Sequence, residues 1–261
     1  MLNTQPIRTW PGTIVLRCPP CSWGKCIFCG YTKDCIVESQ LSGKDFLNQF
    51  RCYFERYGIP DHLEIYNSGS FLDDKQISPN SRIEIFRYLY EQGVWSVAIE
   101  SRPEYIRRDN LTPLLAEYKG DLTVCIGLEV ADDVVLRKLR KGFSLKDVEK
   151  AQSLLKSMGL LSRAYILTGA TFTQSAVHQA IESVQYAKRL GFDEISLLAA
   201  YPMEGTQGYE LWRKGEWRLL DLKEFNNIVI AARQIMPGID VSCFGLREFL
   251  KKSREPNIKR R

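Results

Sequence analysis

The 261-residue sequence has little histidine and no long hydrophobic run. Its two histidines, His62 and His178, are expected at the surface or in packing, and no serine, histidine and aspartate follow a catalytic-triad order. A glycine-rich phosphate loop and a cobalamin-binding domain are also missing. No tract is long enough to cross a bilayer, and the first residues lack the layout of a signal peptide. We therefore expect a cytosolic enzyme with no membrane partner.

Cysteine, by contrast, is concentrated in one segment. Four of the eight cysteines lie close together in the sequence, at Cys18, Cys21, Cys26 and Cys29. Without a secretion signal, such a group indicates metal or redox chemistry rather than disulfides. Cys35 follows closely and is expected to be a spectator. The isolated residues are expected to pack in the core: Cys52, Cys125 and Cys243.

The net charge is also localised. The chain has 36 basic and 31 acidic residues, and residues 247–261 alone contain seven basic and two acidic side chains. This segment therefore carries the whole net charge of +5. We predict a neutral core over residues 1–246 and a basic C-terminal tail over residues 247–261 that approaches a polyanion.

Strand-like and helix-like segments alternate along the chain. Predicted strands cover residues 13–17, 63–66, 94–99, 123–128, 160–167 and 194–198, with a short extra strand at 239–243. Predicted helices cover residues 46–57, 81–92, 144–158, 175–190 and 222–235, and Pro103 suits the first turn of another. Six strands that alternate with helices predict an α/β fold with a parallel sheet. Such a sheet is either open and doubly wound or curled into a barrel.

The strongest motif is the loop Cys21-Ser-Trp-Gly-Lys-Cys26-Ile-Phe-Cys29, directly after the first predicted strand. Three thiolates at this spacing can bind three corners of an iron–sulfur cube and leave the fourth iron open. Phe28, before the last cysteine, would shield such a cluster. The alternative is a zinc site that adds Cys18 as a fourth ligand, although zinc knuckles usually form small separate modules. In the cluster reading, Cys18 is a spectator or supports the ligands from behind.

This loop resembles that of the radical S-adenosylmethionine (SAM) enzymes. The segments that follow it resemble, more narrowly, the archaeal radical SAM enzymes of archaeosine formation, the RaSEA family, which is related to the Elp3-like branch. The resemblance covers roughly residues 13–220 and rests on these segments in order: residues 66–73, 99–106, 127–130 with 141–143, 165–167 and 205–215. It implies a partial (βα)6 TIM-type barrel.

The resemblance also implies an activity. RaSEA enzymes use a [4Fe–4S] cluster and SAM to cleave a lysine adduct on a 7-deazaguanine base of tRNA, which leaves the amidine of archaeosine. The implied partners are tRNA, a lysine-transferase subunit and an external electron donor. Two alternatives remain. A radical SAM enzyme could act on a different RNA, peptide or small molecule, because Thr168-Gly169 departs from the family pattern. A zinc-stabilised RNA-binding protein would have no turnover.

Polar residues after the second predicted strand are candidates for holding SAM. Asn67, Ser68, Gly69 and Ser70 occupy the place of the Gly-Gly-Glu loop of the superfamily, whose backbone contacts the SAM amino group. The competing interpretation is an ordinary turn between a strand and a helix.

Charged residues near the ends of later strands are further candidates, because chemistry in such barrels gathers after the strands. Glu100 and Glu129 could hold the SAM ribose or a substrate amine, or could belong to an ion-paired rim. Arg102 is a candidate for a phosphate or the SAM carboxylate. Arg140 and Lys141 match the place of a basic residue that faces this carboxylate in related enzymes, or lie on a solvated helix surface.

Overall fold

The computed structural model describes residues 5–33, 41–169, 175–241 and 246–252 of the chain. The chain divides into two compact units. Unit 1 comprises residues 1–24, 31–126 and 153–161, and unit 2 comprises residues 25–30, 127–152 and 162–261. Cys35, Cys243 and the last part of the basic segment lie outside the described residues. A search of the described helices found none with the length and hydrophobicity to cross a membrane.

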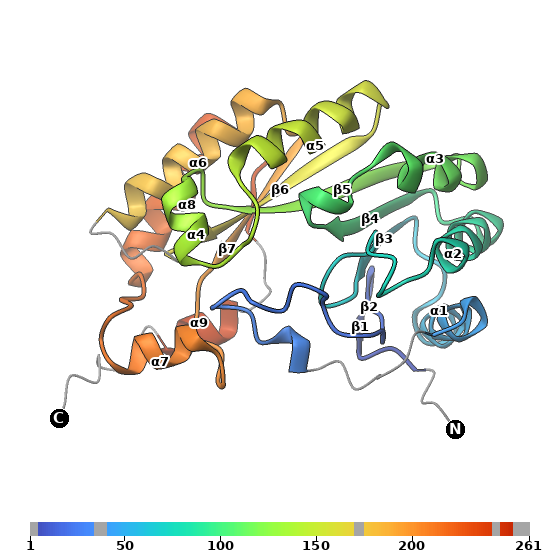
Figure 1. Ribbon diagram of the computed structural model, residues 1–261, viewed down its shortest axis with the longest axis horizontal. Helices are drawn as coiled ribbons and strands as arrows, with labels where there is room; N and C mark the ends of the chain where they lie inside the picture. The colour runs from blue at the N-terminus through green and yellow to red at the C-terminus, as the bar shows by residue number, and fades with distance from the viewer. Residues whose placement is uncertain (1–4, 34–40, 170–174, 242–245, 253–261) are drawn as a thin grey trace. The chain divides into compact units, whose positions relative to one another are not determined.

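Unit 1 is built on neighbouring strands that follow chain order. These are β1 (Arg8–Trp10), β2 (Thr13–Val15), β3 (His62–Tyr66), β4 (Ser96–Ser101) and the first part of β5 (Asp121–Glu129). β1 runs antiparallel to β2, and the other neighbours pair in parallel. The helices α1 (Gly43–Tyr57), α2 (Pro79–Gln92) and α3 (Arg108–Glu117) pack against one another in sequence (Figure 1). This layout is the strand–helix alternation that the sequence predicts.

Local sequence signals define the first helices of unit 1. Ser42 caps α1 through a reciprocal pair of hydrogen bonds with Asp45, so the helix starts before the first aromatic residue of its apolar face. Phe46 and Phe50 then point into the core at helical spacing and are fully buried. α2 ends at Gly93, whose left-handed backbone (φ 87°) favours glycine.

Unit 2 contains the strands β6 (Leu161–Thr168), β7 (Glu194–Ala199) and β8 (Asp240–Val241), which pair in parallel in this order. Its helices are α4 (Asp133–Lys138), α5 (Leu145–Ser157, whose last turn belongs to unit 1), α6 (Ala176–Leu190), α7 (Gln207–Arg213), α8 (Leu222–Ile235) and α9 (Leu246–Lys252). α6 packs against α8 (Figure 1). Phe249 of α9 is buried against Phe225, so the predicted boundary at residue 246 falls at the start of a packed helix.

Several elements differ from the sequence prediction. β1 was not expected, because three residues with no apolar alternation leave no readable pattern. Pro103 begins only a short 3-10 turn (Pro103–Tyr105), and α3 starts at Arg108. The short helices α4 and α7 were also not predicted, since one or two turns show no reliable hydrophobic periodicity.

Candidate functional site

The stem of the cysteine loop belongs to unit 1 and is fixed by buried hydrogen bonds. Gln49 of α1 accepts a bond from the Arg17 amide at 2.7 Å and donates to the Arg17 carbonyl at 3.0 Å. Cys18 is fully buried, and its thiol donates to the carbonyl of Asn67 at 3.1 Å. Cys21, by contrast, is a partly exposed free thiol. Cys18 is therefore a component of the packed stem, whereas Cys21 can reach a ligand.

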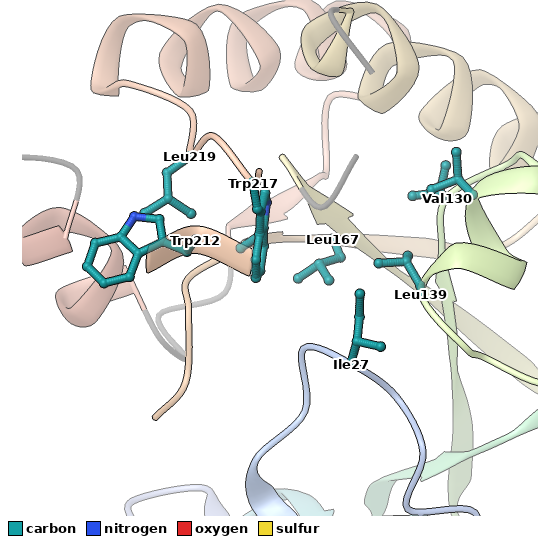
Figure 2. Close-up of a cluster of buried hydrophobic side chains, with 9 residues drawn as sticks. Ile27, Val130, Leu139, Leu167, Trp212, Trp217 and Leu219 are labelled. Carbon is teal, nitrogen blue, oxygen red and sulfur yellow. The ribbon is translucent and has the colours of Figure 1, made fainter. Parts of the chain in front are cut away.

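The rest of the cysteine loop, residues 25–30, belongs to unit 2 and is anchored by Ile27. The Ile27 amide donates to the carbonyl of Leu139 at 3.2 Å, and its carbonyl accepts from the amide of Gly208 at 2.7 Å. Its side chain lies in a buried apolar cluster shown in Figure 2. That cluster comprises Ile27, Val130, Val135, Leu139, Leu167, Ala200, Trp212, Trp217 and Leu219. Cys26 and Cys29, on either side of this anchor, remain partly exposed.

The four clustered cysteines thus separate into two kinds. Cys21, Cys26 and Cys29 are partly exposed, whereas Cys18 is buried and hydrogen-bonded. A four-cysteine zinc site would need Cys18 as its fourth ligand, but its thiol is buried and bonded within the stem. The three partly exposed thiols therefore fit a cube with three protein ligands better than a four-cysteine zinc site.

The loop after β3 connects the neighbouring strands of unit 1. The amide of Asn67 donates to the Glu100 carboxylate at 3.3 Å, and the Ser70 hydroxyl accepts from the Arg102 amide at 3.0 Å. Asn67 and Ser70 are buried. The structure therefore brings together the two polar segments that the sequence placed after β3 and β4, Asn67–Ser70 and Glu100–Arg102.

Gly69 lies between these residues, and its lack of a side chain allows close packing against a neighbour. A Cβ atom added there would collide with the side-chain amide of Gln76. The predicted SAM loop therefore rests on this amide, and a larger residue at position 69 would displace it.

Arg102 is committed to neighbours in unit 1. Its side chain is largely buried, its Nε donates to Glu104 at 2.6 Å, and its guanidinium lies 4.9 Å from the ring centroid of Trp23. This cation–π contact stabilises the cysteine loop at Trp23, two residues after Cys21.

Tyr105 follows Glu104 in the same segment. Burial raises the pKa of Tyr105, and the nearby acidic side chains raise it further, so its phenol stays protonated at neutral pH.

An almost buried ion pair lies in unit 2, after β5. Lys141 Nζ is 2.8 Å from Glu129 Oε1, and both side chains are less than one-tenth exposed. The ammonium also lies 5.6 Å from the ring centroid of Phe28 and 5.2 Å from that of Phe143. A Cβ atom on Gly127 would approach Glu129 Oε1 to 2.9 Å, so glycine leaves the space that the pair occupies.

Arg140 and Lys141, which the sequence could not separate, have different surroundings. The Arg140 side chain is exposed, whereas Lys141 is buried beside Glu129. Only Lys141 therefore has the enclosed position expected of a residue that binds a ligand carboxylate.

Backbone strain gathers in the same segments. Three non-glycine residues of the described chain have a left-handed backbone: Ser68 (φ 57°), Glu129 (φ 61°) and Arg140 (φ 56°). Each such conformation costs about 1–3 kcal/mol and concentrates at functional sites. All three residues were candidates from the sequence. Of the three, Glu129 is also buried.

The sequence did not predict the contacts of three residues, Trp23, Glu104 and Gln76. Trp23 and Glu104 lie within the cysteine loop and the segment 99–106, so those two motifs already contain the partners of Arg102. Gln76 had no signal, because a single glutamine among polar residues is ordinarily exposed. His62 and His178 are exposed, which fits the expected surface position.

Replacing Gly208 with Ala should loosen the unit 2 part of the cysteine loop. The added Cβ would lie 2.7 Å from a ring carbon of Trp217 and 2.9 Å from the Ile27 carbonyl oxygen. We expect a loss of about 2 kcal/mol in the free energy of unfolding, as for other overpacked sites, measured by urea denaturation. Gly238→Ala is the control, because nothing lies within 4 Å of its added Cβ. Equal stability of the two variants would contradict the predicted clash.

No family model matches the chain. Several curated proteins are similar to it. The archaeosine synthase subunit beta of Methanosarcina acetivorans is 29% identical over 238 residues, which cover 83% of this chain and 68% of that protein. The protein of the same name from Thermococcus kodakarensis is 33% identical over 185 residues, which cover 69% of this chain and 56% of that protein.

Solved structures are similar to the chain in fold. A queuine lyase from Clostridium spiroforme bound to SAM and queuine matches with a TM-score of 0.63 and 19% identity, over 88% of this chain and 90% of that chain. A radical SAM methyltransferase from Kitasatospora setae with cobalamin and a [4Fe–4S] cluster bound matches with a TM-score of 0.55 and 16% identity, over 79% of this chain and 40% of that chain. These likenesses confirm the predicted fold class, the partial barrel of the radical SAM enzymes.

Proposed function

We propose that the chain, which is similar to the archaeosine synthase beta subunits and has the fold of radical SAM enzymes, is a tRNA-modifying lyase. Its proposed substrate is a 7-deazaguanine base that carries a lysine adduct, and cleavage of a C–N bond leaves the amidine of archaeosine. The observation that carries this proposal is the set of three partly exposed cysteines on one anchored loop, in a chain related to those subunits. The likeness to a lyase that binds SAM supports the reaction class.

We assign the cofactors to two segments, the cysteine loop and the loop after β3. Cys21, Cys26 and Cys29 would bind a [4Fe–4S] cluster. The neighbouring Cys18 is buried and bonded to the Asn67 carbonyl, so it would not be a fourth ligand. The cluster, when bound, supplies the electron that cleaves SAM to methionine and a 5′-deoxyadenosyl radical. The buried and strained loop from Asn67 to Ser70 would contact the methionine end of SAM.

The Glu129–Lys141 pair supports binding of an α-amino acid group. The two charges lie 2.8 Å apart in nearly complete burial. An amino acid head group carries the same two charges, so its ammonium can pair with Glu129 while its carboxylate pairs with Lys141. Charge therefore stays balanced when the pair opens to accept it. SAM and a lysine adduct both carry such a head group, and we assign the pair to that of SAM, in line with the expected role of Lys141.

The proposed function requires partners. Reduction needs an external electron donor, and the substrate needs a transferase that has already attached lysine to the tRNA base. We assign the basic residues of the segment 247–261 to tRNA contact, because this segment carries the whole net charge of the chain.

The direct test uses the full chain, reconstituted with iron and sulfide without oxygen. Reduced protein and SAM are incubated with lysine-modified tRNA, and the nucleosides are analysed by mass spectrometry. We expect archaeosine together with 5′-deoxyadenosine, and neither product when SAM is omitted.

Other outcomes would contradict specific parts of the proposal. Formation of 5′-deoxyadenosine with an intact lysine adduct would retain the radical SAM chemistry and reject this substrate. Colourless protein that holds one zinc and releases no 5′-deoxyadenosine would support an RNA-binding protein without turnover.

A further inference from the structure

Gln76 lies just before α2 and is completely buried in unit 1. Its Oε1 accepts a hydrogen bond from the Ser70 amide at 2.7 Å. Its Nε2 donates to the Pro19 carbonyl at 2.9 Å and lies 3.5 Å from the Asn67 carbonyl. One side-chain amide therefore joins both ends of the loop after β3 to the stem of the cysteine loop.

The surroundings leave this amide little freedom. Gly69 packs so closely on it that a single added carbon would collide. The Cys18 thiol, which donates to the same Asn67 carbonyl, lies 3.7 Å from Gln76 Nε2. Pro19 lies two residues before Cys21. A shift of the Gln76 amide would therefore move the segment that leads to the Cys21 thiol.

We infer that Gln76 is a positioning residue that fixes the Asn67–Ser70 loop relative to the stem before Cys21. This inference rests on the proposed function, in which the loop contacts SAM and Cys21 binds the cluster. Gln76 itself touches neither group in this role. Its amide couples the two because it is hydrogen-bonded to both Pro19 and Ser70.

The first test compares Gln76→Met with Gln152→Met. Methionine preserves the volume and removes the hydrogen bonds. Gln152 is also a buried amide in unit 2, and it donates to Ser162 Oγ and the Gly191 carbonyl, both at 2.9 Å. Both variants should lose stability. Only Gln76→Met should weaken SAM binding to the cluster-loaded protein, by about tenfold if one or two hydrogen bonds of the loop are lost.

The second test uses Gln76→Glu and varies pH. A protonated carboxyl accepts from Ser70 and donates to Pro19 as the amide does, whereas an ionised one cannot donate and faces two carbonyl oxygens. Burial raises the pKa of such a carboxyl, so we expect SAM affinity to recover as pH falls from about 8 to about 6. Nearby titratable groups are the Cys18 thiol, Asp73, Lys75 and Glu100. The unsubstituted chain carries the same groups. The ratio of the two SAM dissociation constants at each pH therefore reports the effect of the new carboxyl alone.

The measurements are iron content, melting temperature and SAM dissociation constant by equilibrium dialysis. Gln76→Met that binds SAM as tightly as Gln152→Met, with Gln76→Glu unaffected by pH, would overturn the positioning role. If the unsubstituted chain holds no cluster or no SAM, the proposed function fails instead. Loss of SAM affinity with near-normal iron content, recovered by Gln76→Glu at low pH, is the expected result.

Discussion

Alanine at Cys21, Cys26 or Cys29 is expected to abolish cluster binding and the production of 5′-deoxyadenosine. Each thiolate holds a different iron in the proposed cluster, so two remaining ligands leave a second iron without protein support. All three thiols are partly exposed and none contributes to the buried core, so the fold should be retained. The checks are iron per chain, the visible absorption of the reconstituted protein, and its circular dichroism spectrum.

Cys18→Ala is the matched control from the same segment. Its thiol is buried and bonded to the Asn67 carbonyl, so its removal should cost about 1 kcal/mol of stability and leave iron binding intact. Loss of the cluster in the Cys18 variant, with its retention in a Cys21, Cys26 or Cys29 variant, would contradict the assignment and favour a different ligand set. Protein without iron but with one zinc bound through all four cysteines would restore the zinc alternative.

Much of the fold was predictable because its longer elements carry strong periodic patterns. The apolar face of α1 and the buried strands β4 to β7 follow directly from residue spacing. β1 and α4 could not be predicted, because three and six residues are too few to establish a hydrophobic repeat.

The sequence indicated the segments of the candidate site but not the contacts among them. The cysteine spacing, the polar loop after β3 and the acidic ends of β4 and β5 are local patterns, and their role in binding stays a prediction. Which of Arg140 and Lys141 turns inward depends on the left-handed backbone at Arg140, where α4 has ended. Likewise, the contact of Arg102 with Trp23 joins residues far apart in sequence, and only the folded chain defines it.

The second large effect is expected at the ion pair of Glu129 and Lys141. Lys141→Met leaves the Glu129 carboxylate buried without its partner, and Glu129→Gln leaves the ammonium without its counter-charge. Breaking a buried pair from one side costs about 3–5 kcal/mol, so each single variant should be strongly destabilised in urea denaturation. The double variant removes both charges and should recover much of this loss.

The double variant also separates a structural role from a binding role. If the pair binds the amino acid head group of SAM, the double variant should stay folded and hold iron while its SAM affinity falls roughly 10–100-fold, because two charge-assisted hydrogen bonds are lost. Arg218→Met serves as a control, since it breaks the more exposed pair with Glu224 in the same unit. Its cost should be about 1 kcal/mol or less, with SAM binding unchanged. A double variant with normal SAM affinity would show that the pair only stabilises the fold.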